Sequence, residues 1–212
     1  LVVESKGIYS IENFLMSRRL MYWQVYLHKT SVAYEKMLIS TLLRAKELAS
    51  RGIDLFASPA LKFFLYNDIS REAFYNNPEC LENFIQLDDN DIWTALKVWS
   101  THTDKVLSTL SLDMINRNIF KVEICSEPIS EERKKELTLL ISRQLGITLS
   151  EADYFVSTPS IEKNMYDSAD DRIDIIYKDG TIKNIAEASD MLNISLLSKK
   201  VKKYYICYLR WD

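Results

Sequence analysis

The feature that most constrains this chain is a single helical pattern that runs from Ser10 to Gly52. Ser10 is suited to cap the start of a helix, and Gly52 is suited to end one. Apolar side chains recur at helical spacing between them, at Ile11, Phe14, Met21, Val25, Val32, Met37, Leu42, Ala45 and Leu48. A helix of about 40 residues is about 60 Å long. We therefore expect this helix either to span its domain or to bend.

Several shorter helices are expected to follow the long one and to pack against it. The pattern places them at residues 60–66, 70–74 and 78–87, and then in two helices that begin at Asp88 and Asp104. Trp93 and Trp99 stand at near-helical spacing, and both are predicted to lie in the core.

Three groups of polar residues could suggest a functional site, but we interpret each of them as structural. Asp88, Asp89 and Asp91 lack the glycine and the distal glutamate of a calcium-binding loop, so we interpret them as a helix cap. His102 is expected to cap a helix or to form a hydrogen bond rather than to take part in chemistry. The lysines within residues 199–203 are interpreted as a solvated approach to the last strand.

The periodicity changes near residue 118, where strand patterns begin. Strands are predicted at residues 1–5, 119–125, 154–156, 172–177, 181–185 and 203–209, and helices at residues 130–145 and 186–192. An Asp-Gly turn joins the fourth and fifth of these strands as a hairpin.

The predicted fold is therefore mainly α with a smaller C-terminal α+β part. It consists of a long N-terminal helix packed by shorter helices, followed by a small mixed or antiparallel sheet with one or two helices. We place the two regions at residues 1–117 and 118–212.

Charge and cysteine content exclude several classes of protein. Residues 1–60 carry eight Lys and Arg against five Asp and Glu, whereas residues 61–117 carry five against nine, within a net charge of −3. A general nucleic-acid-binding protein is basic over a whole face, so nucleic acid is not expected as a partner. Cys80, Cys125 and Cys207 form no Cys-x-x-Cys pair, which favours a reducing cytoplasm over a disulfide framework or zinc site. No apolar run approaches the roughly 20 residues that cross a bilayer, so no membrane contact is expected.

Arg18, Tyr22 and Tyr26 are the leading candidates for a binding site. They are four residues apart, which aligns them along one ridge of a helix. A guanidinium binds phosphate oxygens through a fixed fork of donors, and two phenols suit an adjacent sugar. The alternative is an Arg18 that pairs with an acidic neighbour and two tyrosines that only pack. His28 lies about 200° around the helix from Tyr26, so one helix can serve two surfaces.

Four segments carry a family resemblance: residues 9–14, 18–29, 87–93 and 117–121. In them the chain resembles the HD-domain phosphohydrolases related to deoxynucleoside triphosphate triphosphohydrolases. The resemblance implies that Arg18, Tyr22 and Tyr26 face the phosphates and sugar of a nucleotide substrate. It further implies a homo-oligomer in which His28 and Lys29 lie near an allosteric nucleotide site at a subunit interface. The position of Tyr22 is often His in nucleotide-cleaving relatives, which leaves the substrate open.

The His…His-Asp…Asp metal site that names this family is missing from the sequence. Its two histidines, His28 and His102, are 74 positions apart, and neither is followed directly by an aspartate. A catalytic metal of this class needs several converging nitrogen and oxygen ligands. We therefore expect no cofactor in this chain and no catalytic residue, with a divalent metal supplied by the rest of the intact protein. Together with a first residue of Leu1, this predicts a C-terminal fragment that is inactive alone.

Two other functions stay open at this point. The first is a non-catalytic assembly or nucleotide-sensing module, which the missing metal ligands favour if the chain is whole. The second and weaker one is binding of single-stranded nucleic acid along the basic and aromatic helix, which predicts a steep dependence on salt.

Overall fold

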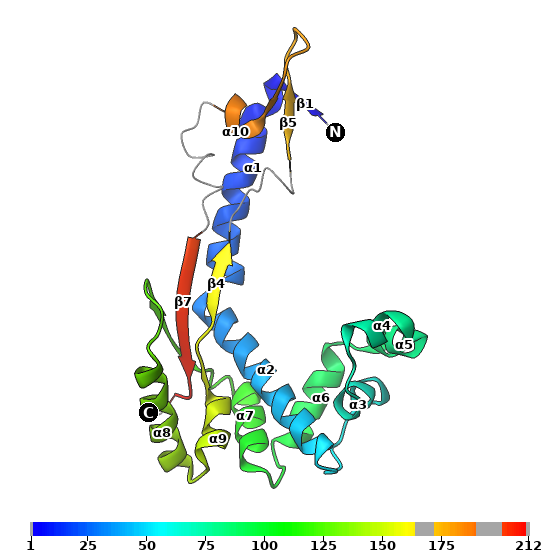
Figure 1. Ribbon diagram of the computed structural model, residues 1–212, viewed down its shortest axis with the longest axis vertical. Coiled ribbons are helices and arrows are strands. Elements are labelled where there is room, and N and C mark those ends of the chain that lie inside the picture. The colour runs from blue at the N-terminus through cyan, green and yellow to red at the C-terminus, as the bar shows by residue number, and fades with distance from the viewer. Residues whose placement is uncertain (1, 164–171, 190–200, 211–212) are drawn as a thin grey trace. The chain divides into compact units, whose positions relative to one another are not determined.

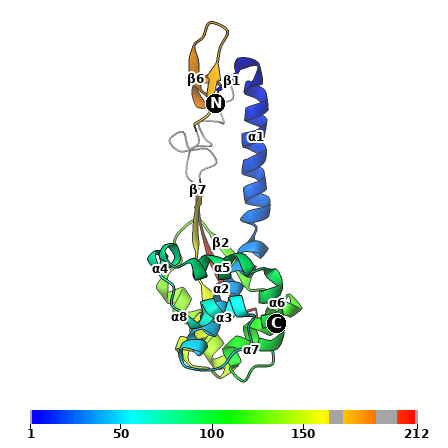
Figure 2. The ribbon, with the colours of Figure 1, turned by 90° about the vertical axis from the view of Figure 1, so that its right-hand side faces the viewer.

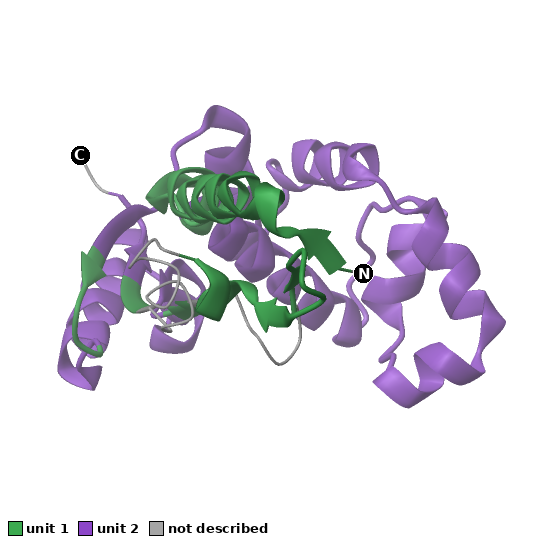
Figure 3. Ribbon diagram, turned by 90° about the horizontal axis from the view of Figure 1, so that it is seen from above, with its two compact units in different colours: residues 1–32, 124–128, 159–205 green, residues 33–123, 129–158, 206–212 purple. Residues whose placement is uncertain are grey.

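The computed structural model describes residues 2–163, 172–189 and 201–210, and Figure 1 labels its helices and strands. The chain packs into two compact units, coloured in Figure 3. Unit 1 comprises residues 1–32, 124–128 and 159–205, and unit 2 comprises residues 33–123, 129–158 and 206–212. Each unit thus combines segments that are distant in sequence. The division of the sequence between residues 117 and 118 stays a prediction.

Unit 1 contains the first helix, α1 (Ile8–Met21), and a small sheet. In the sheet, β1 (Val2–Glu4) runs parallel to β5 (Asp174–Ile176), and β6 (Ile182–Asn184) runs antiparallel to β5. A 3₁₀ turn, η1 (Ser5–Gly7), joins β1 to α1, and the short α10 (Ile185–Ala188) follows β6. These elements lie at the N-terminal end of α1 (Figure 1). The predicted mixed sheet is confirmed.

The β5–β6 hairpin turns at Gly180, as the sequence predicts. Gly180 has a φ of 83°, a conformation that side-chain-bearing residues rarely adopt. Inside unit 1, the buried side chains of Leu15, Ile175 and Ile185 form one apolar cluster. Ile11 and Trp23 pack against this cluster, so α1 is fixed to the sheet through a few large apolar contacts.

Unit 2 is mainly helical (Figure 2). It contains most of α2 (Lys29–Ser50) and then α3 (Pro59–Tyr66), α4 (Arg71–Asn76), α5 (Pro78–Gln86), α6 (Asp89–Trp99), α7 (Lys105–Asn116), α8 (Glu131–Leu145) and α9 (Leu149–Ala152). Its buried side chains include Met37, Trp99, Leu107 and Met114. Together with the sheet strands, these helices confirm the predicted fold class, mainly α with a smaller α+β part.

Helix caps in unit 2 follow the sequence pattern closely. The side chain of Asp88 accepts hydrogen bonds from the backbone N–H groups of Asn90 and Asp91, and Asp91 accepts one from Asp88 in return. This reciprocal capping box confirms the interpretation of the acidic group as a cap. Asp104 caps α7 by accepting one hydrogen bond from the backbone N–H of Leu107, and Gly146 ends α8 with a φ of 63°.

The prediction that Trp93 lies in the core is wrong, whereas that for Trp99 is confirmed. Trp99 is 1% exposed, and its indole N–H donates to the carbonyl of Phe56 at 2.9 Å. Trp93 is 40% exposed. Six residues correspond to about 240° around an α-helix, so the two side chains point to different faces.

The remaining strands run through the later part of the chain. They are β2 (Lys121–Cys125), β3 (Val156–Ser157), β4 (Ser160–Lys163) and β7 (Val201–Tyr208). Within unit 1, β4 pairs antiparallel with the start of β7; within unit 2, β3 pairs antiparallel with its end. The strand predicted at residues 154–156 is mostly a 3₁₀ turn, η3 (Asp153–Phe155). Parts of two predictions, the helix at residues 190–192 and the lysines at 199–200, lie outside the described residues.

The predicted single helix from Ser10 to Gly52 is interrupted. It begins at Ile8 without a side-chain cap, so the predicted cap at Ser10 is wrong. After α1 the chain forms a π-helical turn, η2 (Tyr22–Tyr26), and α2 (Lys29–Ser50) begins three residues later. Leu27 between them has φ −103° and ψ 15°, outside the helical region. No helix in the described part of the chain is long and apolar enough to span a membrane.

Truncation of Leu15 tests whether the apolar cluster holds unit 1 together. Leu15→Ala removes a side chain that is 1% exposed and leaves a cavity against Ile175 and Ile185. We expect a loss of about 2–5 kcal/mol in the free energy of unfolding. Leu20→Ala is the matched control, because Leu20 is 50% exposed on the same helix, and should change stability by about 0.5 kcal/mol or less. Hydrogen exchange of the α1 amides measures the loss of stability in each variant. Equal protection in Leu15→Ala and Leu20→Ala would show that the apolar cluster does not hold unit 1 together.

Candidate functional site

The π-helical turn Tyr22–Tyr26 is the most unusual backbone feature of unit 1. The N–H of Leu27 donates to the carbonyl of Tyr22 at 2.8 Å, five residues back instead of four. The turn therefore holds one more residue than an α-helical turn. Such turns are rare and frequently coincide with functional sites, since they change the direction of a few side chains without ending the helix. This turn contains two of the three residues that the sequence singles out for ligand contact.

Arg18, Tyr22 and Tyr26 lie in a row along α1 and the π turn. The guanidinium of Arg18 stands 5.8 Å from the centroid of the Tyr22 ring, and the rings of Tyr22 and Tyr26 are 5.2 Å apart with an interplanar angle of 40°. Arg18 and Tyr22 are half-buried, and Tyr26 is 58% exposed. Tyr22 packs against the apolar cluster of unit 1. The structure thus brings together the three side chains whose spacing predicts one ridge.

The charge of Arg18 has no acidic partner within the described residues. Its contact there is with the Tyr22 ring, which is neutral. A cation over a tyrosine face gains about 0.5–2 kcal/mol, and its N–H donors stay available to a ligand. The alternative in which Arg18 pairs with an acidic neighbour therefore finds no support in this part of the chain.

His28 and Lys29 stand where the helix resumes. The Nδ1 atom of His28 accepts a hydrogen bond from the N–H of Thr30 at 3.2 Å, which is the pattern of a side chain that caps a helix start. The hydroxyl of Ser31 donates to the carbonyl of Val25 at 3.0 Å and ties the new helix to the π turn. Both His28 and Lys29 are exposed. A role at a subunit interface or an allosteric site stays a prediction.

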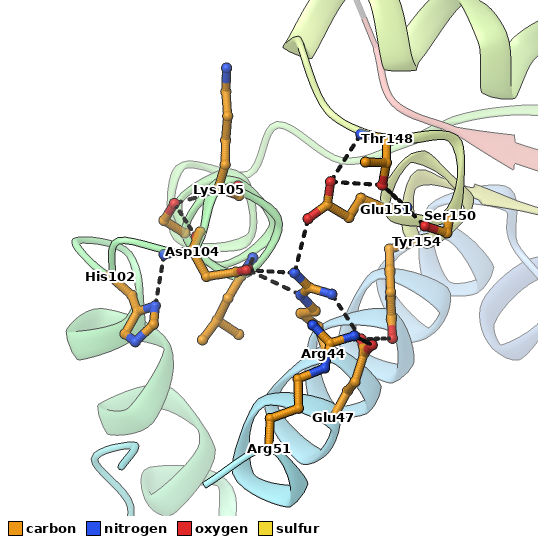
Figure 4. Close-up of polar contacts among 12 residues, drawn as sticks. Arg44, Glu47, Arg51, His102, Asp104, Lys105, Thr148, Ser150, Glu151 and Tyr154 are labelled. Atoms are coloured by element: carbon orange, nitrogen blue, oxygen red, sulfur yellow. Dashed lines mark hydrogen bonds and ion pairs between the residues drawn. The ribbon is translucent and has the colours of Figure 1, made fainter. Parts of the chain in front are cut away.

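A second charged cluster, in unit 2, surrounds Arg44 (Figure 4). The guanidinium donates to both carboxylate oxygens of Asp104, at 3.1 and 2.6 Å, to Glu47 at 2.8 Å and to Glu151 at 3.2 Å. The hydroxyl of Tyr154 donates to Glu47 at 2.6 Å. The Arg44 side chain is only 4% exposed. No local sequence pattern indicates this cluster, because its hydrogen bonds join residues up to 107 positions apart.

The pKa values of the Arg44 cluster show a network that is already paired. Burial raises the pKa of Asp104, but the hydrogen bonds from Arg44 and from the Leu107 amide outweigh it and leave this pKa below its usual value. The Tyr154 hydroxyl lowers the pKa of Glu47, and the Thr148 amide lowers that of Glu151. Burial, followed by the bond to Glu47, raises the pKa of Tyr154 to about 12. Each charge already has a partner, so we assign this cluster a structural role.

His102 also takes a structural role. Its Nδ1 atom accepts a hydrogen bond from the N–H of Asp104 at 3.0 Å, which confirms the predicted hydrogen-bonding role. In the described part of the chain, no three His, Cys, Asp or Glu side chains are grouped so that they could hold a metal ion. The three carboxylates of the Arg44 cluster converge on a guanidinium instead.

Comparison with known proteins adds a family context. Residues 1–56 match the model of a family described as the HD associated region. The chain is 86% identical in sequence to a phosphohydrolase from Bacteroides thetaiotaomicron VPI-5482, with a TM-score of 0.92, over 99% of this chain and 52% of that one. These two matches support a relationship to HD-domain proteins.

Two more distant relatives match over the same extent. The chain is 26% identical to the uncharacterized protein YwfO of Bacillus subtilis (strain 168), over 98% of this chain and 46% of YwfO. A hypothetical protein from Aquifex aeolicus shares the fold at 23% identity and a TM-score of 0.56, over 99% of this chain and 44% of that one. The chain therefore spans about half the length of each of these relatives.

Replacement of Arg44 tests the structural role of its cluster. Arg44→Met leaves three carboxylates facing one another, and we expect a loss of about 3–5 kcal/mol in stability at pH 7. Arg51→Met is the matched control, because Arg51 binds the same Glu47 but is 57% exposed; its expected loss is below about 1 kcal/mol. Urea denaturation measures both values.

The pH dependence of the Arg44→Met loss provides a second readout. The pKa values of Glu47, Asp104 and Glu151 are lowered in the folded chain, so their stabilising effect is present above about pH 4 and lost as the pH falls further. The difference between the wild type and Arg44→Met should therefore shrink below about pH 4, where the carboxylates become neutral. A difference that stays constant down to pH 3 would show that Arg44 acts through packing alone.

Proposed function

We propose that the protein containing this chain is a metal-dependent HD-type phosphohydrolase that acts on nucleotides, with a deoxynucleoside triphosphate as the first substrate to test. Within it, this chain supplies a surface that contacts the phosphates and the sugar, and part of an oligomer interface. The observation that carries the proposal is the row of Arg18, Tyr22 and Tyr26, in which the cation has no acidic partner within the described residues. The 86% identity to a phosphohydrolase supports the class of reaction.

The row has the chemistry that a nucleotide requires. The guanidinium of Arg18 offers paired N–H donors that match two phosphate oxygens. The phenols of Tyr22 and Tyr26 follow about one and two helical turns later and can donate to sugar or phosphate oxygens. Arg18 would neutralise phosphate charge as it redistributes during hydrolysis, while the tyrosines shape the sugar pocket.

The described residues do not provide a set of ligands for the metal of this proposed enzyme. No three suitable side chains lie together there, and the Nδ1 atoms of His28 and His102 both accept backbone hydrogen bonds. The proposal therefore places the metal ligands in the half of the longer relatives that this chain does not match. This chain then supplies binding and orientation rather than a catalytic residue.

The oligomer and the cytoplasmic location are parts of the same proposal. The exposed side of α1 and η2 carries Phe14, Met21 and Val25, which are 60%, 44% and 57% exposed. Apolar residues of this kind favour contact with another protein surface. His28 and Lys29 follow directly and would lie near such an interface. A cytoplasmic enzyme fits the free cysteines of the described residues.

The same exposed apolar side favours a second candidate function, a non-catalytic assembly or nucleotide-sensing module. Such a module would bind nucleotide at the Arg18 row and change its assembly without turnover. The two functions differ in one measurement: the longer protein with its metal either hydrolyses a deoxynucleoside triphosphate or binds it unchanged.

Substitution of Arg18 tests the proposed role of the row. Calorimetric titration with deoxynucleoside triphosphates should show Arg18→Ala binding about 10- to 150-fold more weakly than the wild type, because charge-assisted hydrogen bonds contribute about 1.5–3 kcal/mol. Arg19→Ala removes the same charge from the next residue, which makes no contact with Tyr22 that the structure records, and should change affinity by less than about 3-fold. Equal affinities for wild type and Arg18→Ala would refute the assignment.

A further inference from the structure

A second cation lies against the same π turn. The ammonium of Lys203 stands 4.1 Å from the centroid of the Trp23 ring, and Trp23 follows Tyr22 directly. This is the shortest cation–ring distance in the described part of the chain, where the others are 5.2–5.9 Å. Lys203 is on β7, where it is opposite Ile161 of β4. A strand from late in the sequence thus brings a positive charge to the turn predicted to bind a ligand.

The charge of Lys203 is also without an acidic partner within the described residues. Its contact there is the Trp23 ring, and the residue is half-buried. Lys202, its neighbour on the strand, is exposed and stands over the ring of Tyr204 instead. Consecutive side chains of a strand point to opposite faces. Therefore Lys203, and not Lys202, is held at the π turn.

The two cations stand over consecutive rings of one turn. Consecutive residues of a helix are about a quarter turn apart, so Tyr22 with Arg18 and Trp23 with Lys203 face adjacent directions. Side chains on adjacent sides of a helix about 10–12 Å in diameter are separated by roughly its width. A single phosphate is too small to meet both cations, whereas a chain of phosphates on a nucleoside extends over a comparable length.

We propose that Lys203, positioned by Trp23, is a second phosphate-binding residue that makes this surface select nucleoside triphosphates over monophosphates. The inference rests on the proposed function, which supplies the nucleotide and the role of Arg18, and it adds two residues and a basis for selectivity. Arg18 holds one end of the phosphate chain through its planar fork. Lys203 attracts the other end as a compact point charge.

Lys203→Met separates the charge from the packing. Methionine keeps an apolar stem against Trp23, so the melting temperature should not change. Calorimetric titration should show about 10-fold weaker binding of a deoxynucleoside triphosphate and of inorganic triphosphate. Binding of the matching monophosphate should change by less than about 2-fold. Lys203→Arg should restore the triphosphate affinity, because it keeps the positive charge.

Lys202→Met is the matched control, because it removes the same charge one residue away on the other face of β7. It should leave both affinities within about 2-fold of the wild type. If Lys203→Met and Lys202→Met behave alike, the inference is wrong, while a loss in Arg18→Ala would still uphold the proposed function. If Lys203→Met weakens the binding of monophosphate and triphosphate equally, the proposed selectivity for triphosphates is wrong.

Two further outcomes bear on both proposals. If the wild type binds no nucleotide, the proposed function fails and the inference fails with it. If a single-stranded oligonucleotide binds more tightly than the triphosphate and with a steep salt dependence, the two cations track a nucleic-acid backbone instead. That result would overturn the assignment of a nucleoside triphosphate to this surface.

Discussion

One backbone hydrogen bond, from the N–H of Leu27 to the carbonyl of Tyr22, determines how the candidate site is arranged. In an α-helix, side chains four residues apart are offset by about 40°, and the extra residue of the π turn reduces this offset. Tyr26 therefore lies close to Tyr22, with ring centroids 5.2 Å apart. The same turn exposes the next ring, that of Trp23, to Lys203. Directly after the turn, Leu27 leaves the helical region and His28 caps the start of a new helix.

The two arginines of interest show opposite ways of holding a buried or half-buried cation. Arg44 is surrounded by three carboxylates, and one of them, Asp104, meets its guanidinium in a bidentate pair. Removal of one member of a buried ion pair strongly destabilises the folded chain, because the other charge then stays buried without a partner. This arrangement therefore suits a role in stability. Arg18 contacts a neutral ring and no carboxylate within the described residues. The two sites therefore differ in their remaining capacity to bind a ligand, which is why we propose a binding role for Arg18 and a structural role for Arg44.

The sequence predicts features that depend on near neighbours and misses those that depend on distant ones. The caps at Asp88 and Asp104, the Gly180 turn and the Arg18–Tyr22–Tyr26 ridge follow from residues that are at most four positions from their nearest partner. The Arg44 cluster joins residues up to 107 positions apart, and Lys203 meets Trp23 across 180. The π turn escapes prediction for another reason. Its side-chain pattern is that of an α-helix, and the shift of one hydrogen bond leaves no mark on apolar periodicity.

A neutral aromatic partner matters for the chemistry at the π turn. A guanidinium paired with a carboxylate forms a unit without net charge, and an approaching phosphate gains little from it. A tyrosine or tryptophan face orients the cation through its quadrupole and leaves the full positive charge in place. Arg18 over Tyr22 and Lys203 over Trp23 are both held in this way. In our proposal, these two cations, which have no acidic partner within the described residues, form a surface that favours ligands with several phosphates, and a single phosphate meets only one of them.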